Sequence, residues 1–166
     1  MAIKRFIATK DTTITNAYKQ SLSSRATASN MGASDILEVF TVYAQVSTSS
    51  TEESRALVNF NFTDVGSKRT DGDIPASGSV NFFLRMFNAE HSETVPISYT
   101  MQITAITKSW QEGYGLDMEE YSDVGYPDGV GATWISASDD STSLSRGKWI
   151  TAGGDFYTGV SNEYNY

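Results

Sequence analysis

Apolar and polar residues alternate with a period close to two along much of the first two thirds of the chain. Successive side chains of a strand point to opposite faces, and Ser, Thr, Val, Ile, Tyr and Phe are frequent in these stretches. The pattern therefore predicts β-strands, and helical periodicity is nearly absent. We expect at least six strands, at residues 5–8, 12–18, 36–43, 55–62, 79–87 and 99–106.

The segments between these strands are polar or rich in glycine. Residues 47–54 predict a polar loop, and residues 64–78 predict a long crossover with a short helical turn at 73–76. Many strands joined by long crossovers are typical of a Greek-key sandwich or a jelly roll. We therefore predict an all-β fold, a Greek-key/jelly-roll β-sandwich with long Gly/Trp-rich C-terminal loops. It would form a single domain over residues 1–166, with its core at 3–156 and a tail at 157–166.

The composition narrows the class of function. Of 166 residues, 39% are hydrophobic, which is enough for a folded core, and no cysteine is present. The lack of cysteine excludes disulfides, thiolate metal sites and a cysteine nucleophile. The one histidine, His91, leaves little material for a Ser-His-Asp triad or a histidine metal site, so we predict that the chain is not an enzyme.

The charge and hydropathy of the chain argue against two kinds of partner. Its formal net charge is −8, without a run of Lys and Arg, so we expect no nucleic acid. No stretch approaches the roughly 20 apolar residues of a membrane helix, so we expect no membrane. The first residues lack the apolar core of a secretory signal, so we expect synthesis and folding in a reducing cytosol.

Residues 110–154 are rich in Gly, Asp, Glu and Trp and predict long loops of functional or surface-wrapping type. Carboxylates on a flexible loop can bind calcium, although the spacing is not that of an EF-hand. A solvated acidic loop without a ligand is the simpler interpretation, and no other cofactor is expected. The predicted calcium ligands are Glu112, Asp117, Glu119 and Asp123, near the further acidic residues Glu120 and Asp128.

Aromatic residues accumulate in the same region. Flat aromatic faces can stack on sugars or contact a protein partner, and this predicts a contact surface. In the alternative, the tryptophans fill gaps in an irregular loop structure, each with its indole N–H bonded to a carbonyl. The residues predicted for glycan or partner contact are Trp110, Trp134, Trp149, Tyr114 and Tyr121.

The order of several motifs along the chain resembles that of a known family. These motifs are DTTI at 11–14, NMG at 30–32, SWQEG at 109–113, ATW at 132–134 and KWITAGGDF at 148–156. Their order resembles the DNRLRE-type jelly-roll domain, a carbohydrate-binding-module-like β-sandwich of bacterial surface proteins. The segment GLDMEEYSD at 115–123 resembles the version found in structural proteins of tailed phages.

The resemblance implies a non-enzymatic structural protein of a tailed-phage virion: a decoration, neck, tail or fibre-associated component. Such a protein is made in the host cytoplasm and located in the virion. Its partners would be copies of itself and other virion proteins, and a host-surface glycan is a further candidate. The alternative is a carbohydrate-binding or adhesin β-sandwich module of a bacterial surface protein.

The chain departs from the family near its end. In the family, further strands follow the Gly-Gly-Asp segment, whereas twelve residues follow Gly154 here. Three explanations stay open: the tail supplies a short closing strand, the chain is incomplete, or a neighbouring subunit lends a strand.

Overall fold

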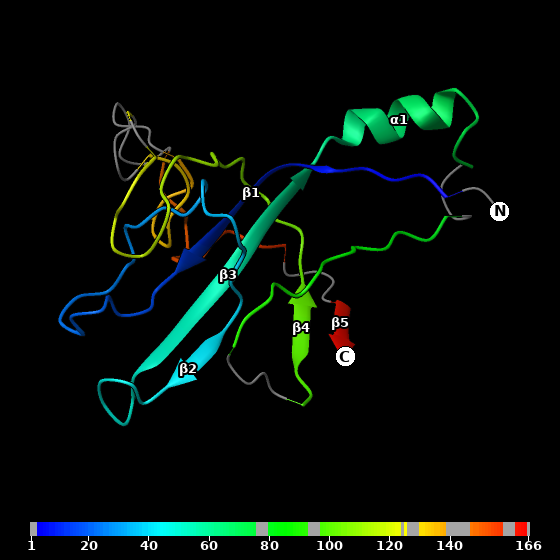
Figure 1. The fold of residues 1–166 in the computed structure, drawn as a ribbon. Helices are drawn as coiled ribbons and strands as arrows, with labels where there is room; N and C mark the ends of the chain where they lie inside the picture. Colours follow the sequence, from blue (N-terminus) through cyan, green and yellow to red (C-terminus); the bar gives the residue numbers. More distant parts are fainter. Residues whose placement is uncertain are drawn as a thin grey trace. The chain divides into compact units, whose positions relative to one another are not determined.

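The chain is rich in strands, as predicted, and it carries one short helix among the residues described (Figure 1). The computed structural model describes residues 3–75, 80–92, 97–123, 125, 130–138, 147–157 and 162–165. Its elements, in chain order, are β1 (Ala8–Thr15), β2 (Thr41–Tyr43), β3 (Thr51–Phe60), α1 (Phe62–Thr70), β4 (Thr100–Ile103) and β5 (Asn162–Asn165).

The chain forms two compact units. The first unit comprises Met1–Lys10 and Val58–Glu93, and the second comprises Asp11–Leu57 and Thr94–Tyr166. The prediction of a single jelly-roll domain over residues 1–166 stays a prediction, as does the Greek-key connectivity.

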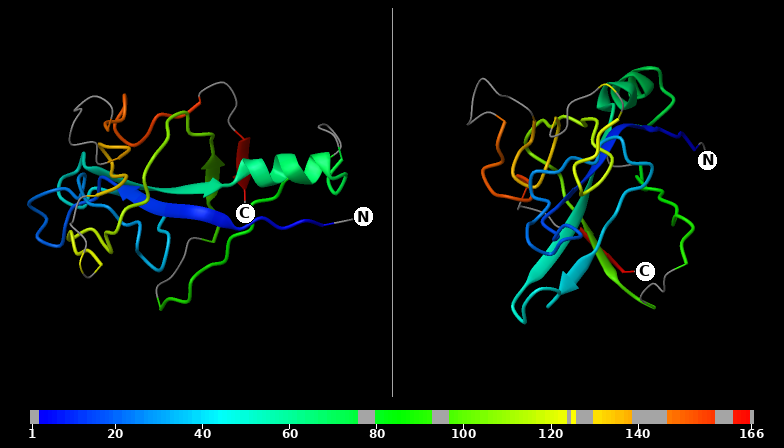
Figure 2. Two further views of the ribbon diagram at one scale, coloured as in Figure 1. Left: turned by 90° about the horizontal axis from the view of Figure 1, so that it is seen from above. Right: turned by 60° about the vertical axis from the view of Figure 1, so that its left-hand side comes forward.

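Strands β1, β3 and β2 form a three-stranded sheet with β3 in the middle (Figures 1 and 2). β2 runs antiparallel to β3, with Thr41 opposite Glu53 and Tyr43 opposite Thr51. β1 and β2 are therefore the two edges of this sheet.

β3 begins earlier than predicted, because polar side chains at its start have buried partners. Glu52 is only 1% exposed, and its Oε2 accepts the Tyr18 N–H at 3.0 Å. With the Gln45 amide nitrogen facing the carboxylate, Gln45 donates to both oxygens of Glu52, at 2.9 and 2.6 Å. Residues 51–54 therefore belong to a strand, and the polar loop predicted at 47–54 ends at Ser50.

The strand predicted at 36–43 is reduced to the three residues of β2. Before it, two backbone N–H groups donate to side-chain hydroxyls rather than to carbonyls of a neighbouring strand. The Glu38 N–H donates to Thr13 Oγ1 at 3.0 Å, and the Phe40 N–H donates to Ser54 Oγ at 2.8 Å. The apolar pattern therefore predicted more of a strand than the three residues that pair with β3.

The helix α1 replaces the loop predicted from residue 64 onwards. Asn61 caps it, its side-chain oxygen accepting the Thr63 N–H at 3.1 Å. Asp64 in the first turn and Lys68 and Arg69 in the last turn complement the helix dipole. The prediction of a loop is wrong up to Thr70, because the cap and the charges at the two ends stabilise a helix despite Gly66.

The strand predicted at 79–87 is also wrong. Residues 80–91 belong to no helix or strand, and most of their side chains are exposed. The alternating pattern there is real, but its apolar side chains find no buried face within the part of the chain that the structure describes. Beyond it, the strand predicted at 99–106 is present in shorter form as β4.

The tail contains a short strand, and the three explanations given for it stay open. β5 pairs antiparallel with β4, with Thr100 opposite Asn165 and Ile103 opposite Asn162 (Figure 1). These two strands form a separate two-stranded sheet in the second unit.

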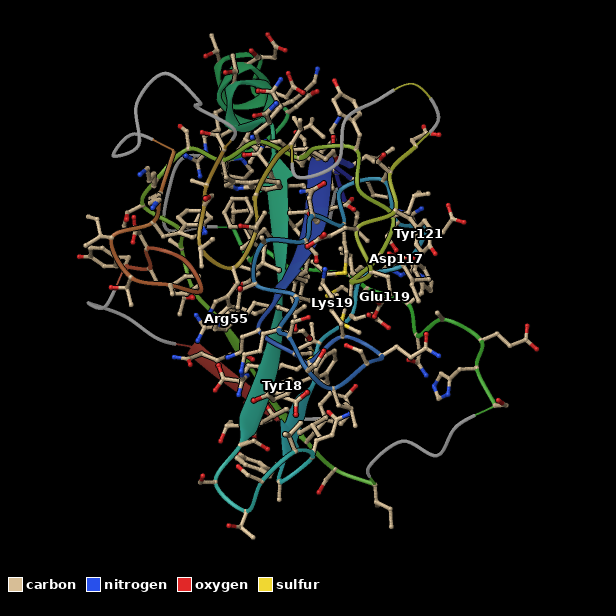
Figure 3. All side chains as sticks on the ribbon, turned by 90° about the vertical axis from the view of Figure 1, so that its left-hand side faces the viewer. Tyr18, Lys19, Arg55, Asp117, Glu119 and Tyr121 are labelled. Carbon is tan, nitrogen blue, oxygen red and sulfur yellow. The ribbon has the colours of Figure 1, made fainter. Side chains whose placement is uncertain are left out.

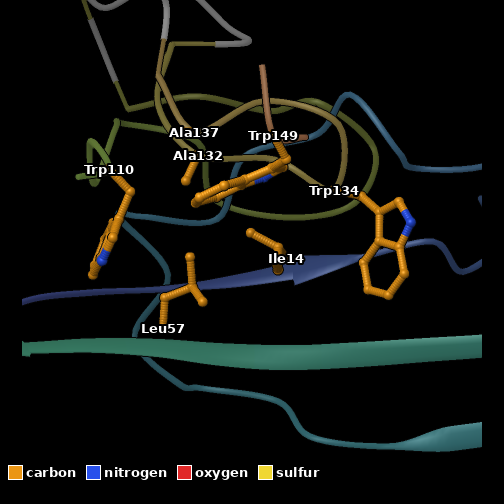
Figure 4. Close-up of a cluster of buried hydrophobic side chains, with 7 residues drawn as sticks. All are labelled: Ile14, Leu57, Trp110, Ala132, Trp134, Ala137 and Trp149. Atoms are coloured by element: carbon orange, nitrogen blue, oxygen red, sulfur yellow. The ribbon is translucent and has the colours of Figure 1, made fainter. Parts of the chain in front are cut away.

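The hydrophobic core lies in the second unit, between the three-stranded sheet and the loops that carry Trp110, residues 132–137 and Trp149 (Figure 4). Ile14 from β1 and Leu57 from β3 contribute the side chains on the sheet side of this core. The loops contribute the indole rings and the small side chains that pack against them. The cluster consists of Ile14, Leu57, Trp110, Ala132, Trp134, Ala137 and Trp149.

Candidate functional site

Three distant segments of the second unit meet at the fully buried side chain of Asn30. Its Nδ2 donates to the Glu112 and Ala132 carbonyl oxygens, both at 2.7 Å. Its Oδ1 accepts the Gly32 N–H at 3.1 Å and the Gly115 N–H at 2.9 Å. One amide thus uses both of its donors and both of its acceptor positions.

Four glycines allow the backbone to approach this amide closely. A Cβ atom on Gly32 would overlap the Glu112 carbonyl, and one on Gly115 would overlap the Asn30 carbonyl. Gly113 and Gly131 also have φ angles of +90° and +112°, which other residues rarely adopt. We call Asn30 and glycines 32, 113, 115 and 131 the Asn30 junction. Sequence reasoning missed it, although the NMG motif and the glycines of the 110–131 loops mark its position.

Three of the four predicted calcium ligands accept hydrogen bonds from backbone N–H groups through their carboxylates: Glu112, Asp117 and Glu119. Glu112 Oε1 accepts the Asp11 N–H at 2.8 Å and so joins the loop to β1. Asp117 Oδ1 accepts the Glu119 N–H at 2.9 Å, which closes a turn within the loop. The Asp123 N–H donates to the Tyr114 carbonyl at 2.9 Å.

Two acidic residues attach this loop to residues 19–20 of the same unit (Figure 3). Glu119 Oε1 accepts the Gln20 N–H at 2.6 Å. Glu120, at a φ of 69°, forms an ion pair with Lys19 Nζ at 2.6 Å. The acidic residues therefore have a structural role in positioning the loop.

Within the described ranges, no group of three or more Asp, Glu and His side chains is placed to hold a metal ion. The calcium site predicted at Glu112, Asp117, Glu119 and Asp123 has no support there. Asp128 lies outside the described residues.

The three tryptophans predicted for glycan or partner contact are buried in the core, each less than 9% exposed. Trp149 Nε1 donates to the Thr133 carbonyl at 2.8 Å, and the Arg55 guanidinium lies 4.8 Å from the centre of a Trp134 ring. These positions agree with the alternative in which tryptophans fill gaps between loops. Their faces pack against protein and are not open for stacking on a sugar.

The two tyrosines of the same prediction lie at the surface. Tyr121 is 66% exposed and Tyr114 is 38% exposed. The Tyr121 N–H is 3.3 Å from Asp117 Oδ1, so the acidic turn fixes the backbone that carries the exposed ring (Figure 3). Of the five predicted contact residues, these two retain accessible side chains.

Three exposed phenylalanines lie in residues 80–87, within the segment for which the sequence predicts a strand. In the first unit, Phe82, Phe83 and Phe87 are 64%, 88% and 78% exposed. We call residues 80–87 the apolar segment.

A second exposed apolar stretch lies in the second unit, at the edge of the three-stranded sheet. It comprises β2 with the residues that precede it, 36–43, and we call it the β2 edge. Its exposed apolar side chains are Ile36, Val39, Val42 and Tyr43.

The two units differ strongly in formal charge. The sequence places six basic and five acidic residues in the first unit, a net charge of +1. The second unit has six basic and fifteen acidic residues, a net charge of −9. The second unit therefore carries all of the chain's net negative charge, and the first unit offsets it by one.

A surface ion-pair network in the first unit joins the N-terminal residues to the end of α1. Lys4 Nζ lies 2.9 Å and Lys68 Nζ 3.3 Å from Asp73 Oδ2. The hydrogen bond from Lys4, followed by that from Lys68, lowers the pKa of the Asp73 carboxyl. Hydrogen bonds to Asp73 and Asp71 raise the pKa of Lys68.

Replacing Lys4 by glutamine is expected to raise the pKa of Asp73 more than Lys68→Gln does, because Lys4 makes the stronger contact. Because folding lowers the pKa of Asp73, the ionised carboxylate stabilises the fold at pH values above the ordinary pKa of 3.8. This stabilisation is lost as the pH falls through the lowered pKa of the folded state. NMR titration of the Asp73 carboxyl carbon measures each shift. Arg85→Gln is the control, and an equal rise in all three variants would contradict the assignment.

No described helix is long and apolar enough to cross a membrane. Comparisons of the chain with models of known protein families, with curated proteins and with solved structures found no match.

Proposed function

We propose that this chain is a non-enzymatic structural protein of a tailed-phage virion that acts through subunit–subunit contacts. It would be a decoration, neck, tail or fibre-associated component with a Greek-key/jelly-roll β-sandwich fold. The observation that carries the proposal is the apolar segment, in which Phe82, Phe83 and Phe87 all face solvent. Monomeric soluble proteins rarely leave such a contiguous apolar stretch uncovered, so a protein partner is the expected cover.

The proposal of a virion protein has a second support, the order of motifs along the chain. This order, and in particular the 115–123 segment, resembles that of phage structural proteins. In the structure this segment is held by Asp117 and by the Lys19–Glu120 ion pair, and it presents Tyr121 at the surface. A fixed loop with an exposed aromatic ring is suited to contact a neighbouring subunit.

Quantitative mass spectrometry of particles purified on a density gradient tests the proposal. We expect the chain to sediment with the major capsid or tail proteins, in many copies per particle, and to withstand a wash with 1 M salt. Recovery of the chain only in the particle-free fraction of the lysate would overturn the assignment.

One second candidate, a carbohydrate-binding or adhesin module, is favoured by the exposed ring of Tyr121, whose backbone N–H is bonded to the carboxylate of Asp117. A glycan array separates the two functions. A carbohydrate-binding module would bind defined glycans and lose them on Tyr121→Ala, but not on Tyr43→Ala, which removes an equally exposed ring from β2. A structural protein would show no such difference.

A further inference from the structure

We propose that the apolar segment of one copy adds as a fourth strand to the β2 edge of the sheet in a second copy. Repetition of this contact would join copies head to tail. The inference rests on the proposed function, which it deepens by naming the two surfaces that subunits use.

The apolar segment has the properties of a strand without a partner. None of its backbone groups hydrogen-bonds to another described residue, and it lies outside every helix and strand (Figures 1 and 2). Its eight residues are within the usual length of a strand. Val80, Phe82, Leu84 and Met86 alternate with Asn81, Phe83, Arg85 and Phe87, so a strand here would present apolar side chains on both faces.

The β2 edge has the properties of an acceptor. β2 pairs with β3 on one side, and no other described strand lies on its second side. Strand addition to such an edge gives main-chain hydrogen bonds, while neighbouring apolar side chains give packing. Val42 and Tyr43 are 38% and 71% exposed there.

The other edge of the sheet is less suitable. In β1 the residues from Thr12 to Thr15 are buried, and the Asp11 N–H is already bonded to the Glu112 side chain. Loops of the second unit therefore already cover much of β1, whereas β2 is open.

The net charges of the two units favour a second copy as the partner, with the first unit of one copy against the second unit of the other. The apolar segment belongs to the unit of net charge +1, and the β2 edge belongs to the unit of net charge −9. Contact between two second units would be strongly repulsive, whereas contact between a first and a second unit is attractive. Because the donor and acceptor surfaces differ, the interface is heterologous, and repetition of such an interface builds rings or open chains.

Analytical ultracentrifugation of the full chain over a range of concentrations tests this arrangement. We expect a mass that rises to at least twice the 18.1 kDa of one chain. The donor variant, Phe83→Pro/Leu84→Pro, removes two backbone donors and two apolar side chains from a segment with no described intrachain hydrogen bond. The acceptor variant, Val42→Lys/Tyr43→Lys, places two charges on the open edge. Each variant alone should weaken association about 30-fold or more.

Mixing the two variants gives the decisive measurement. The donor variant keeps a working β2 edge and the acceptor variant keeps a working apolar segment, so the mixture should form a one-to-one dimer that grows no further. Ile97→Ser, which removes a fully exposed apolar side chain outside both surfaces, is the control and should assemble like the parent. Circular dichroism checks that every variant is folded.

Other outcomes overturn the proposal. A parent chain that stays monomeric, with the backbone amides of residues 80–87 protected from hydrogen exchange, would mean that the segment pairs within its own chain. A monomer with unprotected amides, or variants that assemble like the parent, would exclude strand addition. If the chain is found in purified particles but is monomeric in solution, only the strand addition is overturned. If the chain assembles head to tail but is missing from particles, only the proposed function is overturned.

Discussion

Replacing Asn30 by alanine is expected to lower the free energy of unfolding of the second unit by about 3–5 kcal/mol. The substitution removes four hydrogen bonds at once and leaves the Glu112 and Ala132 carbonyls and the Gly32 and Gly115 N–H groups without their buried partner. Each buried backbone group left unpaired costs about 1–3 kcal/mol, and partial relaxation keeps the total below the sum.

Urea unfolding followed by tryptophan fluorescence measures this effect directly, because all three tryptophans lie in the core of the second unit. Asn30→Asp tests the donor atom of the amide alone. It keeps the acceptor oxygen but replaces Nδ2 by an oxygen that faces two carbonyls, so a similar loss of unfolding free energy is expected. Asn88→Ala is the matched control, since its exposed amide contacts only His91 in the described chain. A change below about 1 kcal/mol for Asn30→Ala would show that the junction is not a stability element.

The second large effect is expected for Gly113→Ala, compared with Gly125→Ala. Both glycines have φ near +90°, so each substitution carries the same backbone penalty of about 1–2 kcal/mol. A Cβ atom on Gly125 would meet nothing within 4 Å, whereas on Gly113 it would overlap the Val130 carbonyl and the Asn30 side chain. We therefore expect about 1–2 kcal/mol for Gly125→Ala and a loss of more than about 4 kcal/mol for Gly113→Ala.

The difference between the two glycine variants isolates the cost of opening the junction, since the φ contribution cancels. The same fluorescence-detected unfolding gives both values. Equal destabilisation would mean that the segments can separate by the width of a methyl group without loss. In that case the hydrogen bonds of Asn30, rather than close backbone packing, would hold the junction together.

Sequence patterns predicted the β-rich character of the fold better than they predicted which strands pair. The β-rich character and the position of β4 followed from period-two alternation, which depends only on local side-chain orientation. Residues 79–87 show the limit of this signal: the alternation is present, but a strand also needs a partner, and a pattern does not supply one. The same limit applies to residues 36–40, where hydroxyl groups of Thr13 and Ser54 take the place of a strand.

The candidate site was predictable only where exposure follows from local sequence. Tyr121 lies at the surface, whereas the tryptophans, assigned to the same contact surface, fill the core. Their burial depends on the glycine-rich loops folding over the sheet, which local sequence does not reveal. The role of Asn30 could not be predicted for a related reason, because three of its four partners lie 82 to 102 positions away in the chain.

The Asn30 junction has a consequence for the order of folding. Its bonds to Glu112 and Ala132 close loops of 82 and 102 residues, and long loops lose the most entropy on closure. Contacts of this separation form slowly, so nearly the whole chain must be synthesised before the three segments can meet. During that interval the phenylalanines of the apolar segment are already outside the ribosome. Timely subunit association, or a chaperone that covers the segment, would then decide how much of the nascent protein escapes aggregation.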